Sequence, residues 1–327
     1  MGRASTYISA LKFGHKIYPE DLAGMIGLPY IGRVFYVDPT GGSDTANNGG
    51  THNTALATVA AGYNACTTVK NDVVLIVPTG SHGRTTETTA ISWAKRFTHL
   101  VGACAPTAQE CRAGMEFSGT TGTATGSLTI TENGCVFKNI CLDGTDDVNT
   151  PVTISGDFNS FLSVDFKGSQ NATTGDDTTA RCLVLTGAVA DYFGGCTFGN
   201  DSTMKSDANA TMEWKSNASR CVFEDCRFVM SADAQTPVAV YAASGGSQQW
   251  MEFKNTSFYA FYTNHSAQVN AVFDISGVAV TLDVLLTGTT CSYAYDDWEK
   301  TLSGHLWIQG YTNTTNVIGL AIQPVIT

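Results

Sequence analysis

Phe161-Leu-Ser-Val-Asp-Phe166 is one copy of a six-residue pattern that places two phenylalanines five residues apart. The pattern returns as Phe193-Gly-Gly-Cys-Thr-Phe198, Phe223-Glu-Asp-Cys-Arg-Phe228 and Phe253-Lys-Asn-Thr-Ser-Phe258, and a fifth copy, Phe137-Lys-Asn-Ile-Cys-Leu142, ends in leucine. Successive copies begin 24, 32, 30 and 30 residues apart. Steps of this length are typical of one coil of a solenoid rather than of a whole domain.

A second strand pattern precedes each copy. Leu128-Thr-Ile130 and Val238-Ala-Val240 alternate apolar with other residues, and turn formers such as Asn133-Gly134 follow. Each repeat therefore predicts a strand, a tight corner, a second strand and a longer loop, with no helical period. The predicted fold class is all-β, a parallel β-helix whose coils bury their inner faces on one another. The predicted core ladder comprises Phe137, Phe161, Phe166, Phe193, Phe198, Phe223, Phe228, Phe253 and Phe258.

The repeats resemble those of the pectate-lyase-like superfamily of right-handed parallel β-helices. In that superfamily an aromatic-x-Asn/Asp-Cys-x-Phe strand recurs once per coil, as Phe223 to Phe228 and Phe253 to Phe258 do here. The superfamily includes polysaccharide lyases, glycoside hydrolases, and bacteriophage tailspike and capsid decoration proteins. The resemblance covers residues 34–290 and implies the fold, whereas one scaffold carries many unrelated functions.

Three segments are predicted along the chain. Residues 1–33 form an N-terminal arm, residues 34–290 form the β-helix with an N-terminal cap, and residues 291–327 form a C-terminal β cap or oligomerisation segment. The cap is expected to include a short amphipathic helix from Thr54 to Thr67, which would cover the open end of the solenoid. Tyr293 to Trp298 are expected to interrupt the strand pattern.

Composition and charge exclude several function classes. The 327 residues are 43% hydrophobic and 14% charged, as expected of a turn-rich β protein with a large core. The net charge of −11 disfavours nucleic acid, anionic membranes and acidic polysaccharides as partners. No apolar run is long enough to span a membrane, and the N-terminal residues do not resemble a signal peptide. These features predict a soluble protein made in a host cytoplasm.

The positions of the ten cysteines do not indicate a disulfide framework. Cys196 and Cys226 occupy the same place in the repeat, so they are predicted to be small buried hydrophobes. Cys104 and Cys111 are spaced loosely and fit a loop disulfide as well as two free thiols. Without a CxxC-like or Cys/His cluster, no metal and no cofactor is predicted.

The search for catalytic residues finds no family signature. The lyase setting Arg-x-Pro-x-x-Arg and the hydrolase signatures Asn-Thr-Asp and Gly-His-Gly are missing. Adjacent carboxylates can act in acid/base catalysis or bind Ca²⁺. The adjacent aspartate pairs in this chain lie among turn-forming residues, so they are expected to be in solvated loops. His99 and His265 stand at plausible coil positions, with no nucleophile at a motif spacing. The three aspartate pairs are Asp146-Asp147, Asp176-Asp177 and Asp296-Asp297.

Two functional interpretations follow. The favoured one is a non-enzymatic virion structural protein, a bacteriophage capsid decoration or head-associated protein. Its partners would be the major capsid or other virion proteins, it would be located in the virion, and it would be a homo-oligomer, a trimer by analogy. The alternative is a polysaccharide-degrading enzyme of β-helix fold, resembling a tailspike depolymerase or a lyase.

The arm, residues 1–33, is predicted to attach the protein to the particle. It carries four basic residues against two acidic ones, a net of +2, so the rest of the chain holds −13 of the total −11. Its apolar residues need a surface to cover, and packing on the chain's own β-helix as an end cap is the alternative. The attachment residues are predicted to be Tyr7, Leu11, Lys12, Phe13, Lys16, Tyr18, Leu22, Ile26 and Tyr30.

Overall fold

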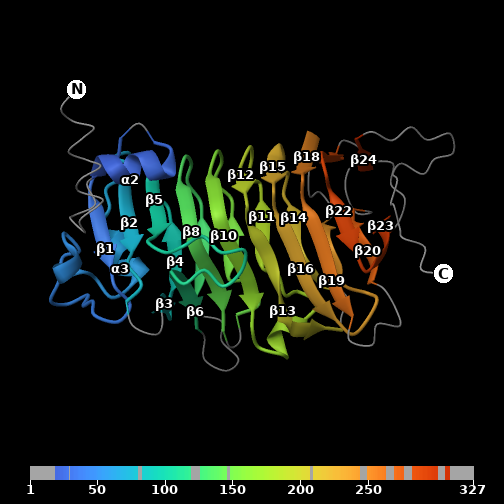
Figure 1. Cartoon of the computed structure of the whole chain (residues 1–327), viewed down its shortest axis with the longest axis horizontal. Coiled ribbons are helices and arrows are strands. Elements are labelled where there is room, and N and C mark those ends of the chain that lie inside the picture. Colours follow the sequence, from blue (N-terminus) through green and yellow to red (C-terminus); the bar gives the residue numbers. More distant parts are fainter. Residues whose placement is uncertain are drawn as a thin grey trace.

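The computed structural model describes residues 19–28, 30–79, 83–118, 126–145, 148–206, 209–243, 249–262, 269–275, 282–300 and 306–309. The chain is a parallel β-helix, as predicted, and its coils succeed one another from the N-terminal to the C-terminal end of the long axis (Figure 1). Every strand pair is parallel, and the strands fall into a 16-stranded and an 8-stranded sheet.

The coil has three faces, which we name A, B and C. Face A, the 8-stranded sheet, consists of β4 (Ala90–Trp93), β7 (Ser127–Ile130), β9 (Val152–Ile154), β11 (Leu183–Thr186), β14 (Ala210–Lys215), β17 (Val238–Ala242), β20 (Val269–Asp274) and β23 (Tyr295–Glu299). Face B consists of β1 (Val34–Val37), β2 (Asp72–Ile76), β5 (Thr98–Gly102), β12 (Tyr192–Gly194), β15 (Cys221–Glu224), β18 (Gln249–Lys254), β21 (Leu282–Thr287), β24 (Leu306–Ile308) and the first halves of β8 and β10.

Face C follows face B across a bend within the larger sheet. It consists of β3 (Arg84–Glu87), β6 (Gly114–Phe117), β13 (Thr197–Lys205), β16 (Arg227–Ala232), β19 (Ser257–Tyr262), β22 (Cys291–Tyr293) and the second halves of β8 (Val136–Gly144) and β10 (Ser160–Ser169). The bend residues adopt positive φ angles, which change the direction of the chain sharply at a single residue. They are Asn139, Ser163, Gly195, Asp225, Asn255 and Gly288.

Two stacks of phenylalanine rings fill the interior. The first stack joins consecutive coils at centroid distances of 4.7 to 5.1 Å, and the second at 4.6 to 5.0 Å. Every ring is at most 1% exposed, so each stack repeats one buried aromatic position along the axis. The first stack is Phe137, Phe161, Phe193, Phe223 and Phe253, and the second is Phe166, Phe198, Phe228 and Phe258.

The N-terminal end is covered by short helices. The cap helix predicted from Thr54 to Thr67 is shorter than expected: η1 (His52–Thr54) is separate, and α3 (Val59–Ala65) begins only after Thr58. The cause is local, because Leu56 pairs with β1 as an extended residue and the Thr58 hydroxyl then accepts the Ala61 N–H as an N-cap.

The part of the arm that the structure describes lies on the chain's own solenoid. Helix α2 (Pro19–Ile26) buries Leu22 and Ile26 in one cluster with Val73 and Leu75 of face B. Tyr30 is 59% exposed. The other predicted attachment residues, Tyr7, Leu11, Lys12, Phe13, Lys16 and Tyr18, lie outside the described residues.

At the far end, the predicted interruption at Tyr293 to Trp298 is wrong. Ala294 has a φ of 61°, which turns the chain from β22 into β23, and β23 pairs with β20. Asp296 and Asp297 therefore lie in a strand and not in a loop.

No described helix is long and apolar enough to cross a membrane.

Candidate active site

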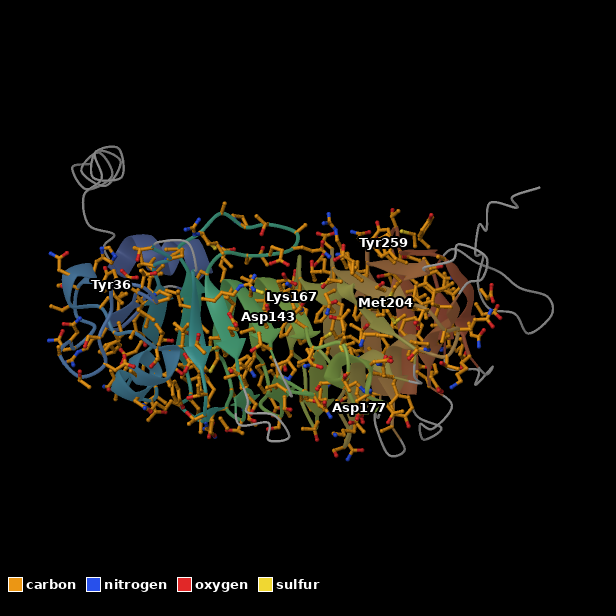
Figure 2. The ribbon with its side chains drawn as sticks, turned by 90° about the horizontal axis from the view of Figure 1, so that it is seen from below. Tyr36, Asp143, Lys167, Asp177, Met204 and Tyr259 are labelled. Atoms are coloured by element: carbon orange, nitrogen blue, oxygen red, sulfur yellow. The ribbon has the colours of Figure 1, made fainter. Side chains whose placement is uncertain are left out.

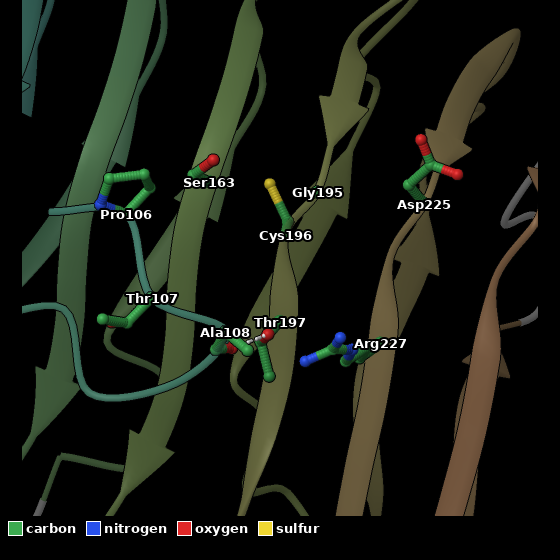
Figure 3. Close-up of a pocket in the computed structure, with 9 residues that line it drawn as sticks. All are labelled: Pro106, Thr107, Ala108, Ser163, Gly195, Cys196, Thr197, Asp225 and Arg227. Atoms are coloured by element: carbon green, nitrogen blue, oxygen red, sulfur yellow. Dashed lines mark hydrogen bonds between the residues drawn. The ribbon is translucent and has the colours of Figure 1, made fainter.

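One long loop lies on the outer surface of the solenoid. Loop 103–113 joins β5 to β6 and crosses the strands of face C (Figure 3). The Glu110 N–H donates to Asp165 Oδ2 at 2.7 Å, and the Thr197 hydroxyl donates to the Ala108 carbonyl. These contacts join the loop to β10 and β13, which are two and three coils beyond the one that it leaves.

Two buried carboxylates lie beneath this loop. Asp143 in β8 and Asp165 in β10 are 4% and 2% exposed, although the strand alternation turns both outward from the core. Each has one oxygen, Oδ1, with no hydrogen-bond partner among the described residues. Other buried polar atoms also lack a partner, among them Asp191 Oδ2, so the case for a candidate site rests on the charged groups that surround Asp143 and Asp165.

Two cations and a third carboxylate complete the cluster. Arg84 donates to Asp143 at 2.7 Å and to Glu110 at 2.9 Å. Lys167 pairs with Glu110 and lies 3.8 Å from Asp143 Oδ2. Figure 2 shows Asp143 and Lys167 together midway along the solenoid. We name these five residues, Arg84, Glu110, Asp143, Asp165 and Lys167, the carboxylate cluster.

The cluster gives its carboxylates different protonation behaviour. Burial raises the pKa of Asp165 to about 7, against the opposing hydrogen bond from the Glu110 N–H. Burial also raises the pKa of Asp143, and there the positive charges of Lys167 and Arg84 oppose the rise. Asp165 therefore carries a proton for much of the time at neutral pH, while Asp143 is the carboxylate held by cations. Environments of this kind separate a general acid from a base.

A pocket opens beside Asp165. It has a volume of about 210 Å³ and lies between loop 103–113 and the outer surface of face C (Figure 3). Its lining residues are Pro106, Thr107, Ala108, Ser163, Gly195, Cys196, Thr197, Asp225 and Arg227.

The strand register links the pocket to the acid. Asp165 pairs with Thr197, and Thr197 pairs with Arg227, so the three residues occupy one outward position on consecutive coils. Neighbouring strands lie about 4.8 Å apart. We name Asp165, Thr197 and Arg227 the outer column.

The residues that the sequence singled out lie elsewhere. Asp176 accepts hydrogen bonds from Ser206 beside η2 (Thr174–Asp176), and exposed Asp177 accepts the Thr179 N–H at 2.8 Å, so this pair supports a loop as predicted. Asp146, Asp147 and His265 lie outside the described residues. His99 is fully buried, and its Nδ1 accepts the Val136 N–H at 3.0 Å.

The cysteine prediction is confirmed for the repeated positions. Cys196 and Cys226 are free thiols, each 1% exposed, beneath the phenylalanine stacks. No group of three or more metal-ligating side chains occurs among the described residues.

Sequence reasoning missed the carboxylate cluster. The signal was the fifth position of the six-residue pattern, which lies between two core positions and therefore points outward. It holds Cys141, Asp165, Thr197, Arg227 and Ser257 in successive copies. This outward position varies between copies, while the repeated positions form the core; of the five cluster residues, only Asp165 occupies it.

Comparison with known proteins finds similarity only in structure. No family model and no curated protein matches the sequence. A pectin methylesterase mutant in complex with a hexasaccharide aligns with a TM-score of 0.56 at 12% identity, over 88% of this chain and 93% of that chain. A second pectin methylesterase–hexasaccharide complex gives 0.56 at 14% identity over the same shares, and the pectin methylesterase of Erwinia chrysanthemi gives 0.55 at 12%, over 88% and 92%.

These similarities show that the chain shares the right-handed parallel β-helix fold of the pectin methylesterases. They also overturn the prediction of a non-enzymatic virion protein, because the structural neighbours are enzymes that act on pectin. The alternative interpretation, an enzyme that processes polysaccharide, agrees better with them.

Proposed function

We propose that the chain is a hydrolase of a neutral or esterified polysaccharide, with Asp165 as general acid and Asp143 as general base. The observation that carries the proposal is the outer column, which places an acid with a pKa of about 7 beside two lining residues of an open pocket. The fold shared with pectin methylesterases supports the substrate class.

The chemistry assigns one step to each carboxyl group. Protonated Asp165 donates its proton to the leaving oxygen of the glycosidic or ester bond. Asp143 accepts a proton from the attacking water, and Arg84 holds the Asp143 carboxylate in place at 2.7 Å. Acid and base groups placed in this way each contribute roughly 10²- to 10⁴-fold to a rate.

The pocket and the outer surface fit a sugar chain. A volume of about 210 Å³ is smaller than the roughly 300 Å³ at which drug-sized ligand pockets begin, so it suits a single sugar ring. Asp225 and Arg227 offer hydrogen bonds to hydroxyl groups there. Further along face C, Tyr259 (Figure 2) pairs in register with Tyr293, which is 62% exposed, so an aromatic ring is available there to stack on a further sugar.

The net charge of the chain limits the classes of polysaccharide that it could bind. A net charge of −11 repels a polyanion such as a free uronate chain. A neutral glycan, or a uronate chain whose carboxyl groups are esterified, carries no such penalty.

The loop must lift before a substrate reaches Asp165. Its Glu110 side chain is 64% exposed, so water screens the ion pairs that Glu110 makes with Lys167 and Arg84. Loop movements that admit a substrate are common in enzymes whose active site is covered by a loop.

The test is a panel of neutral and methyl-esterified polysaccharides, with release of reducing ends and of methanol as readouts. At least one substrate is expected to be turned over, and Asp165→Asn and Asp143→Asn are each expected to lower the rate by roughly 10²-fold or more. Asp233→Asn, which changes an exposed aspartate outside the cluster, serves as the matched control. Absence of turnover on the whole panel, or full activity of Asp165→Asn, would refute the proposal.

A further inference from the structure

Loop 103–113 carries a cysteine near each end. Cys104 Sγ lies 3.4 Å from the carbonyl oxygen of Asn139, and Cys111 Sγ lies 3.8 Å from that of Ser163. Asn139 and Ser163 are bend residues of consecutive coils, whose strands lie about 4.8 Å apart. The two sulfurs therefore lie side by side, and the two thiol groups hydrogen-bond to each other.

The two thiols differ in reactivity. The hydrogen bond from Cys104 lowers the pKa of Cys111 to about 6, and the contacts with Thr107 and the charge of Arg84 act in the same direction. The pKa of Cys104 is raised by the same hydrogen bond and by burial. The lowered pKa favours the thiolate of Cys111, the form of cysteine that reacts with oxidants, while the raised pKa of Cys104 favours its protonated form.

Two residues that line the pocket separate Cys111 from it. Cys111 is only 1% exposed, but the Thr107 hydroxyl lies 3.6 Å from its sulfur. Thr107 and Ser163, which both contact this sulfur, also line the 210 Å³ pocket. Cys104 is partly exposed at the other end of the loop.

We propose that Cys104 and Cys111 form a peroxide-sensitive thiol pair whose disulfide fixes loop 103–113 over Asp165. In the first step the Cys111 thiolate attacks one oxygen of hydrogen peroxide, the O–O bond breaks, and a sulfenic acid and water result after uptake of a proton. In the second step the Cys104 sulfur attacks Cys111 Sγ and expels water. Two thiols and one peroxide thus give one disulfide and two waters.

The disulfide would close the stretch of loop that holds Ala108 against Thr197 and Glu110 against Asp165. This consequence rests on the proposed function, because a loop that cannot lift keeps substrate from the acid. Oxidation is therefore expected to abolish turnover, and a reducing thiol is expected to restore it.

The experiment uses the full chain in a Cys291→Ser background, which removes the exposed thiol. After peroxide treatment at pH 7, peptide mapping is expected to show Cys104 linked to Cys111, and the loop amides are expected to exchange more slowly with deuterium. Because its lowered pKa favours the thiolate, Cys111 should be oxidised faster than free cysteine in the same solution.

Two variants separate the roles of the cysteines. Cys104→Ser should leave a sulfenic acid at Cys111 that dimedone traps, and Cys111→Ser should leave Cys104 reduced. The proposal is overturned if both cysteines stay reduced while free cysteine is oxidised, or if Cys104 reacts equally fast without Cys111. The thiol readouts need no substrate, so they stand apart from the turnover assays of Asp165→Asn.

Discussion

Replacement of Asp165 by asparagine is expected to stabilise the protein at neutral and alkaline pH. The carboxyl group is 2% exposed, and burial raises its pKa from an ordinary value of 3.8 to about 7. Folding therefore favours the protonated form. Below pH 4 both folded and unfolded chains carry the proton and the group has no net effect. Between pH 4 and 7 the unfolded chain alone releases it, so the free energy of unfolding falls as pH rises.

The magnitude follows from the shift. About three pKa units correspond to roughly 4 kcal/mol, which is the destabilisation by Asp165 above pH 7. The substituted amide has no charge to bury, and its oxygen can still accept the Glu110 N–H. Urea denaturation of wild type and Asp165→Asn from pH 4 to 8 should therefore show a difference that is near zero at pH 4 and reaches about 2 to 4 kcal/mol at pH 8. The exposed control Asp233→Asn should show no such trend. Parallel stability curves for wild type and Asp165→Asn at every pH would refute the reasoning.

Three further predictions concern the core, the buried histidine and the cap. Phe223→Ala should lower the free energy of unfolding by about 3 to 5 kcal/mol, because the Phe223 ring lies 4.7 Å from the rings of both Phe193 and Phe253. Replacement of the exposed Phe261 by alanine should change it by less than about 0.5 kcal/mol, and equal losses for the two variants in urea denaturation would contradict the stack. Burial lowers the pKa of His99 to about 4, so the stability that the neutral imidazole provides above pH 6.5 is lost as pH falls toward 4. An NMR titration in which the imidazole is protonated near pH 6.5 would disprove this. Glu87→Ala should lower the free energy of unfolding by about 1 to 3 kcal/mol, because buried Glu87 accepts the first N–H of α3 from Val59 at 2.8 Å. Glu87→Gln should lower it by less, and equal shifts in melting temperature for the two variants would argue against this hydrogen bond.

The fold could be predicted from the sequence because a solenoid repeats its core. Phe193, Phe223 and Phe253 recur at one spacing, and each identical position stacks on the next. The bend is visible in the same pattern, since Asn139, Asp225 and Asn255 stand two residues after the first phenylalanine and are residues that tolerate positive φ.

The candidate site could not be predicted in the same way. Loop 103–113 contacts Asp165 from two coils earlier in the solenoid, and no periodicity in the sequence indicates where that loop goes. Arg84 reaches Asp143 from a strand 59 residues earlier, so the pairing exists only in the coiled chain. The aspartate pairs drew attention because they are adjacent in sequence, whereas the solenoid brings together residues that are one coil apart.

The measurement that tests the central claim most directly is the pH dependence of kcat/KM on the polysaccharide that the wild type turns over. If protonated Asp165 is the general acid, kcat/KM should fall above about pH 7 with the pKa of that carboxyl group in the free enzyme. Asp165→Asn should be roughly 10²-fold or more slower and should lose this alkaline decline. An alkaline decline that persists unchanged in Asp165→Asn would contradict the account, because another group would then supply the proton.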